Sequence, residues 1–154
     1  MKVFFIVLFF VITNNLTAQQ QVVTELISVS TNHPTSWEVY VSNSDFKIEY
    51  KFVNCDPSRG MDFEGVIFKI TNLTQTKIAF SWHKLLYYAG NCRTCNYPEE
   101  YSFTISIPAN SSVEGDCEPD SGYDLKLFSK FIDQAYSQGD KLTGFQLGNL
   151  TVKF

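Results

Sequence analysis

The chain has 154 residues, of which 44% are hydrophobic and 16% aromatic, and its formal net charge is −4. This length accommodates one domain, and the hydrophobic fraction supports a buried core, which argues against a disordered chain. The negative charge and the lack of any run of lysine or arginine in the sequence argue against nucleic-acid binding. The high aromatic content favours strands, because aromatic side chains suit the half-buried surface of a sheet.

The first 18 residues have the pattern of a secretory signal peptide. Lys2 supplies the positive start, residues 4–12 are almost wholly apolar, and a short polar stretch ends at Ala18. The apolar run is too short to cross a bilayer, and the sequence has no second run of that kind. We therefore expect a signal peptide at 1–18, a single domain at 19–154 that is secreted or periplasmic, and no membrane span.

The remainder of the chain alternates short apolar-polar segments with polar turns. Apolar residues recur with a period of two, which is the pattern of a strand with one buried face. In chain order, this pattern predicts strands near residues 22–29, 37–42, 46–54, 66–70, 78–87, 101–107, 111–116, 125–132 and 145–154. We expect an all-β protein, an antiparallel Ig-like β-sandwich of about eight strands.

Two irregularities interrupt this pattern. The phase of the alternation slips around Lys84 and again at Gly148-Asn149, and each slip suggests a β-bulge. The segment 133–143 shows no strand pattern and is expected to be a loop with room for one helical turn.

The chain has four cysteines: Cys55, Cys92, Cys95 and Cys117. An even number in an exported protein predicts two disulfides. If consecutive strands alternate in direction, all four cysteines lie at the same end of the sandwich. We favour Cys92–Cys95 as a local clasp and Cys55–Cys117 as a long-range staple, although the two crossed pairings remain open.

The Cys92-Arg93-Thr94-Cys95 sequence has an alternative interpretation as a thiol-redox or metal-binding motif. Redox pairs usually stand at the start of a helix, and no helical pattern follows Cys95. A four-cysteine zinc site usually has two closely spaced pairs, whereas this chain has one. The acidic residues of the neighbouring loops lack a calcium-loop pattern and are interpreted as solvated. No metal site and no cofactor are expected.

Five loop residues are candidates for binding. Tyr88 and Tyr97 flank the cysteine loop that contains Arg93, while Asp56 and Arg59 belong to the loop after Cys55. Tyrosine suits contact surfaces because it combines an apolar ring with a polar tip.

No catalytic site is expected from the sequence. His33 and His83 are the only histidines, and neither accompanies a Gly-x-Ser-x-Gly motif, so both are interpreted as packing residues. Asn72, Asn110 and Asn149 begin glycosylation sequons, which matter only in a eukaryotic secretory pathway.

Several short runs resemble small secreted bacterial β-sandwich proteins of uncharacterised function. These runs are residues 54–60, Asn72-Leu73-Thr74, residues 90–95 and Gly115-Asp116-Cys117. The resemblance implies secretion from a bacterium and no particular activity. The leading hypothesis is a non-catalytic binding or envelope-associated protein that recognises a protein or glycan partner through its disulfide-tied loops. The alternative is a thiol-redox or metal-binding protein that uses the four cysteines.

Overall fold

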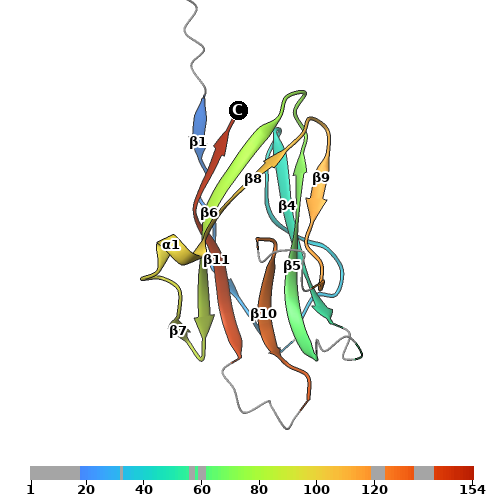
Figure 1. The fold of residues 1–154 in the computed structure, drawn as a ribbon, viewed down its shortest axis with the longest axis vertical. Helices are drawn as coiled ribbons and strands as arrows, with labels where there is room; N and C mark the ends of the chain where they lie inside the picture. The colour runs from blue at the N-terminus through green and yellow to red at the C-terminus, as the bar shows by residue number, and fades with distance from the viewer. Residues whose placement is uncertain (1–17, 32, 56–57, 59–61, 119–123, 134–140) are drawn as a thin grey trace, which may run out of the picture.

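A computed structural model describes residues 18–31, 33–55, 58, 62–118, 124–133 and 141–154. Nearly all of the expected signal peptide and most of the segment expected to hold a helical turn lie outside these residues. The described part is mostly β-strand, with one short helix, and its strands form two antiparallel sheets (Figure 1).

The first sheet is built around two long central strands, β6 and β11, which pair with each other. Short strands extend it on both sides: β1 and β2 pair with β11, while β7 and β8 pair with β6. Its members are β1 (Gln19–Gln21), β2 (Ile27–Ser28), β6 (Ile78–Tyr88), β7 (Asn91–Cys92), β8 (Ser102–Ile107) and β11 (Leu142–Lys153). The helix α1 (Pro98–Tyr101) directly precedes β8.

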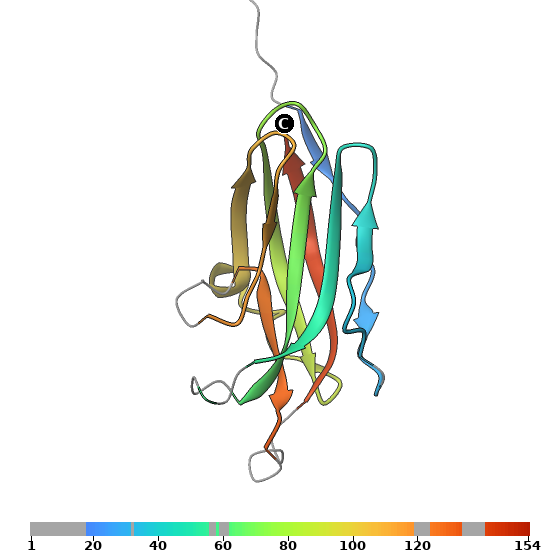
Figure 2. The same cartoon turned by 90° about the vertical axis from the view of Figure 1, so that its right-hand side faces the viewer.

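The second sheet has β4 and β5 at its centre. The strand β3 pairs with β4 at one edge, and β9 and β10 pair with β5 at the other. Its members are β3 (Glu38–Ser42), β4 (Phe46–Asn54), β5 (Phe63–Asn72), β9 (Ser112–Glu114) and β10 (Lys126–Phe131). The long strands of both sheets run along the long axis of the molecule (Figure 2).

The core lies between the two sheets and is rich in aromatic side chains. Phe46 of β4 meets Phe80 of β6 with ring centroids 5.2 Å apart, and Phe68 of β5 meets Phe145 of β11 at 5.6 Å. All four rings are essentially excluded from solvent. Full burial of one such side chain contributes roughly 1.5–3 kcal/mol, so these cross-sheet contacts are a main source of stability.

The strands lie close to the positions that the alternation predicts, with local differences. The first predicted strand is replaced by the separate strands β1 and β2, and neither β7 nor α1 is expected from the sequence. The bulge predicted at Gly148-Asn149 is present, because the pairing of β11 with β6 shifts between Gly148 and Thr151.

The bulge predicted near Lys84 is wrong. Consecutive residues of β6 from His83 to Tyr88 pair with β11, and both register shifts of this pair add a residue to β11 and not to β6. Lys84 simply occupies an inward position of the regular alternation, between Trp82 and Leu86, which are also buried.

Both disulfides in the structure are the pairs favoured from the sequence. Cys55 bonds to Cys117 with a Cα–Cα distance of 5.6 Å, and Cys92 bonds to Cys95 at 5.7 Å. Cys55 follows β4 and Cys92 lies in β7, so each disulfide is associated with a different sheet. The ends of β4 and β6 nevertheless point to the same end of the molecule (Figure 1).

Asn72 fixes the opposite end of the sandwich. Its side chain is fully buried, and its amide nitrogen donates hydrogen bonds to the carbonyls of Thr76, Ile107 and Pro108. Its side-chain oxygen accepts from the backbone nitrogen and hydroxyl of Thr74. The amide thereby joins the β5–β6 turn to the end of β8. A buried, fully used amide cannot carry a glycan in the folded chain.

Asn72→Ala is expected to lower the free energy of unfolding by about 3 kcal/mol or more, because it leaves several buried polar groups without partners. Urea unfolding measures this loss. Asn96→Ala is the matched control, since Asn96 is exposed, and its effect should stay within about 0.5 kcal/mol. Equal effects of the two substitutions would contradict the role given to Asn72.

Candidate binding cleft

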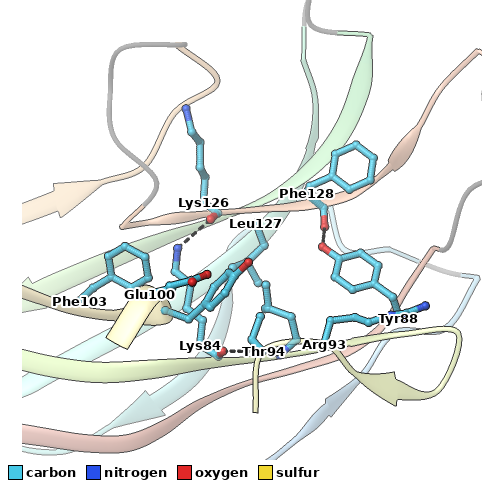
Figure 3. A pocket seen from close by; sticks show the side chains of 11 residues that line it. Lys84, Tyr88, Arg93, Thr94, Glu100, Phe103, Lys126, Leu127 and Phe128 are labelled. Atoms are coloured by element: carbon cyan, nitrogen blue, oxygen red, sulfur yellow. Dashed lines mark hydrogen bonds between the residues drawn. The ribbon is translucent and has the colours of Figure 1, made fainter. Parts of the chain in front are cut away.

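A cleft of about 460 Å³ opens between the two sheets, beside the end that carries the disulfides (Figure 3). One wall comes from β6, the cysteine loop, α1 and the start of β8, and the other comes from β10. The lining residues are Lys84, Leu86, Tyr88, Arg93, Thr94, Glu100, Tyr101, Phe103, Lys126, Leu127 and Phe128.

The cleft lies where the outer edge of β6 lacks a paired strand. The strand β8 pairs with β6 only from Ile78 to His83, and β7 pairs only with Tyr87 and Tyr88. The intervening residues 84–86 would expose backbone groups that must be hydrogen-bonded when buried. The cysteine loop supplies those partners in place of a strand.

Thr94 is the side chain that completes this edge. Its hydroxyl donates to the Lys84 carbonyl at 2.6 Å and accepts from the Leu86 nitrogen at 2.9 Å. The Arg93 nitrogen donates to the Leu86 carbonyl, and His83 Nε2 donates to the Thr94 carbonyl at 3.0 Å. Thr94 is 2% exposed. These bonds hold the cysteine loop against β6 and fix one wall of the cleft.

Two polar side chains of β6 cross the cleft to β10. Lys84 Nζ donates to the Lys126 carbonyl at 3.0 Å, and the Tyr88 hydroxyl donates to the Phe128 carbonyl at 2.7 Å (Figure 3). Lys126 and Phe128 are two positions apart on an edge strand, so their carbonyls face the same side. The two bonds tie the sheets together and occupy backbone acceptors that an edge strand would otherwise offer to another chain.

Burial perturbs both of these groups. Desolvation lowers the pKa of the Lys84 amine to about 7; the nearby Asp124 carboxylate opposes this shift, and the Lys126 ammonium adds to it. Burial likewise raises the pKa of the Tyr88 hydroxyl to about 12. Lys84 is 3% exposed and its Nζ lies 4.3 Å from the centre of the Phe103 ring. A lysine of this kind is available as a neutral amine near neutral pH.

The rest of the lining is mainly apolar, with charge at the rim. Leu86, Leu127 and Phe103 present hydrocarbon surface, whereas the Phe128 ring points away from the cleft and packs against Phe63 and Phe131. Arg93 brings positive charge and Glu100 negative charge to the rim, whereas the Lys126 side chain points away from the cleft, toward the Glu118 carbonyl. The arrangement suits a compact apolar group that carries an acidic substituent.

The structure places only some of the five predicted binding residues at the cleft. Tyr88 and Arg93 line the cleft. Tyr97 is 56% exposed and lies outside the lining. Asp56 and Arg59 lie outside the described residues.

Sequence reasoning did not identify the β10 wall or Lys84. The signal for Lys84 was present, since it stands in phase with Ile78, Phe80 and Trp82. A charged residue at an inward position of a core strand is unusual. Because the apolar Leu85 follows Lys84 out of phase with the preceding residues, the sequence suggests a bulge instead.

Both histidines pack within polar surroundings. The His33 ring stacks on Phe52 at 4.2 Å, and its Nδ1 lies 2.8 Å from the Glu64 carboxylate. The Ser129 hydroxyl also donates to Glu64, at 2.9 Å. Serine and histidine therefore share one carboxylate, which differs from the relay of a Ser-His-Asp triad, where the histidine receives the serine proton.

The four cysteines are all disulfide-bonded, so none offers a thiolate to a metal in this state. Within the described ranges, no group of three or more histidine, cysteine or acidic residues is placed to hold a metal ion. In the same residues, no helix is long and apolar enough to cross a bilayer.

Comparison with protein-family models gives no match, and comparison with curated proteins gives none either. The functional argument therefore depends on the cleft itself.

Lys84→Met is expected to raise the free energy of unfolding by about 1–3 kcal/mol near pH 6, because methionine has similar length and no charge to desolvate. Between pH 7 and 10.5 the unfolded chain holds a proton that folded Lys84 has released. The stability of the unsubstituted protein therefore rises with pH across this interval, and the advantage of the variant shrinks. Urea unfolding at several pH values measures this difference.

Lys153→Met provides the control for that series, since Lys153 is exposed. A stability difference for Lys84→Met that does not change with pH would show that the buried amine is not neutralised in the folded protein.

Thr94→Val keeps the shape of the side chain and removes its hydroxyl. The carbonyl of Lys84 and the nitrogen of Leu86 then lose a partner, and we expect a loss of about 2–3 kcal/mol. Amide hydrogen exchange at Leu86 should accelerate at the same time. Thr104→Val is the matched control, because the Thr104 hydroxyl pairs with Ser81 on the exposed face and its loss should change neither measurement much.

Proposed function

We propose that this protein is an exported, non-catalytic binding protein whose cleft between β6 and β10 holds a small, largely apolar ligand with an acidic group. The observation that carries the proposal is the cleft: about 460 Å³, lined mainly by apolar side chains, with few polar groups at defined positions. These are the usual properties of small-ligand sites in proteins.

The walls of the cleft are organised before any ligand arrives. Thr94 fixes the cysteine loop to β6, and Lys84 and Tyr88 connect β6 to β10. The Cys92–Cys95 disulfide closes the loop that carries Thr94 and Arg93. Organisation in advance reduces the ordering cost of binding.

Charge around the cleft supports an acidic ligand. Arg93 lines it together with Lys84, whereas the chain as a whole is negative. An anion beside Lys84 stabilises the protonated amine, so binding of an acid would be accompanied by proton uptake near neutral pH.

Export belongs to this proposal, as do the bacterial origin and the Ig-like strand order expected from the sequence. Two disulfides support an oxidising compartment. Two facing antiparallel sheets support a sandwich. The sequence predicts a protein or glycan partner, but the apolar lining of the cleft favours a small ligand or the apolar end of a larger one.

The test uses 8-anilinonaphthalene-1-sulfonate as probe, because it combines aromatic rings with one negative charge. We expect one-site binding to the folded, disulfide-intact protein, measured by fluorescence titration. Arg93→Glu should weaken binding about tenfold, equal to about 1.4 kcal/mol. Phe103→Ala should also weaken it by removing part of the apolar wall, because the Phe103 ring lines the cleft beside Lys84.

Lys77→Glu is the control for charge, since Lys77 is exposed in the turn before β6, away from the cleft lining, and the substitution changes the net charge equally. Binding that is insensitive to Arg93→Glu and Phe103→Ala, or equally sensitive to Lys77→Glu, would place the probe elsewhere and reject the cleft as the site.

A further inference from the structure

The Lys84 amine is positioned for covalent chemistry as well as for charge. It projects from the inward face of β6 into the cleft, where open space adjoins it on the side of Phe103 and the apolar wall. The side chain is almost fully excluded from bulk solvent. A primary amine held in an apolar cavity next to room for a ligand is the arrangement by which proteins bind carbonyl compounds through an imine.

We propose that Lys84 is a reversible attachment site for an aldehyde, with the cleft selecting aromatic or similarly apolar aldehydes. This inference rests on the proposed function, because the aldehyde must first occupy the cleft.

The chemistry balances without any additional reactant. The Lys84 nitrogen adds to the carbonyl carbon, and the carbonyl oxygen takes a proton to give a carbinolamine. The C–O bond then breaks, the oxygen leaves as water with a second proton that came from nitrogen, and a C=N bond forms. Nothing is oxidised or reduced, and hydrolysis returns the amine and the aldehyde.

The surroundings of Lys84 favour this reaction over the same reaction at other lysines. A solvated lysine is almost wholly protonated at neutral pH and has no lone pair for attack. Burial lowers the pKa of the Lys84 amine to about 7, so about half of it is neutral there. The Lys126 carbonyl accepts from Nζ and holds the amine at the β10 wall. Limited access of water also slows hydrolysis of the imine.

The groups that face this amine come from several elements. The Lys126 carbonyl on β10 contacts it, Asp124 and the Lys126 ammonium act on it electrostatically, and Tyr88, Arg93 and Glu100 line the same cleft. Of these, Glu100 is solvent-exposed at the rim, where it can exchange protons with water during loss of the hydroxyl group.

The experiment compares benzaldehyde with benzyl alcohol, which has the same ring and no carbonyl. The folded, disulfide-intact protein is treated with benzaldehyde and cyanoborohydride at pH 7, and the benzylated residues are located by peptide mapping. We expect Lys84 to be labelled at least about tenfold faster than any other lysine. The preference should disappear in guanidinium chloride, where the cleft no longer exists.

Substitutions give a second measurement. Lys84→Arg should abolish the selective label but retain benzyl alcohol binding. That binding is measured by the shifts of the Leu86 and Leu127 methyl resonances. Lys153→Arg is the matched control and should leave the label at Lys84 unchanged, since Lys153 is exposed and is not part of the cleft lining.

The outcomes separate the two proposals. Binding of benzyl alcohol at the cleft, together with even labelling of all lysines by benzaldehyde, would overturn the attachment site and leave the binding function standing. Even labelling without benzyl alcohol binding would likewise overturn the attachment site, and failure of 8-anilinonaphthalene-1-sulfonate to bind as well would reject the binding function too. Selective labelling of Lys84 in the unsubstituted protein supports the attachment site even if Lys84→Arg fails to fold.

Discussion

The candidate site depends on how the outer edge of β6 is completed at residues 84–86. A strand paired along the whole outer edge of β6 would hydrogen-bond these backbone groups, but it would also close this side of the sandwich. Here Thr94 satisfies the Lys84 carbonyl and the Leu86 nitrogen with one hydroxyl, and the Arg93 nitrogen satisfies the Leu86 carbonyl. A loop thus replaces a strand, and the space between β6 and β10 stays open. The energetic requirement that buried backbone groups be bonded is met without filling the cleft.

On the opposite side of the sandwich, a core side chain spans the two sheets. There the Tyr40 hydroxyl donates to the Glu25 carbonyl and accepts from the Leu147 nitrogen, while its ring contacts Phe68 and Phe145. The side chain of β3 therefore spans to β11 and joins the core. On the cleft side, the Tyr88 hydroxyl also connects the two sheets. The inward position at residue 84, however, holds a lysine that bonds to β10 and not an apolar core side chain. A cation at that position disfavours dense packing and favours a polar contact with β10.

The regular parts of the fold could be predicted from the sequence because local alternation reports the buried face directly. Strands such as β4 and β8 follow from their period-two patterns, and the bulge in β11 follows from Gly148-Asn149. The strand order predicts only that the cysteines lie at one end and leaves three pairings open; the pairs preferred among these agree with the structure. Tyr88 and Arg93 were accessible to this reasoning because they flank or belong to the cysteine loop.

The cleft itself could not be predicted, since it depends on which strand edges face each other across the sandwich. Nothing local in Lys126, Leu127 or Phe128 indicates that β10 stands opposite β6. The role of Thr94 is equally non-local, because its hydroxyl acts on the backbone of residues ten and eight positions away. Lys84 is the exception, since its inward phase was visible in the sequence. Its interpretation required knowing that β6 contains no bulge.

The central claim is that an organised cleft between β6 and β10 binds a small apolar ligand with Lys84 in its wall. A crystal structure of the disulfide-intact protein grown with 8-anilinonaphthalene-1-sulfonate tests it most directly. The account predicts the rings of the probe against Leu86, Leu127 and Phe103, with its sulfonate toward Arg93 or Lys84. A cleft filled by the protein's own side chains, or a probe bound only at another surface, would contradict it.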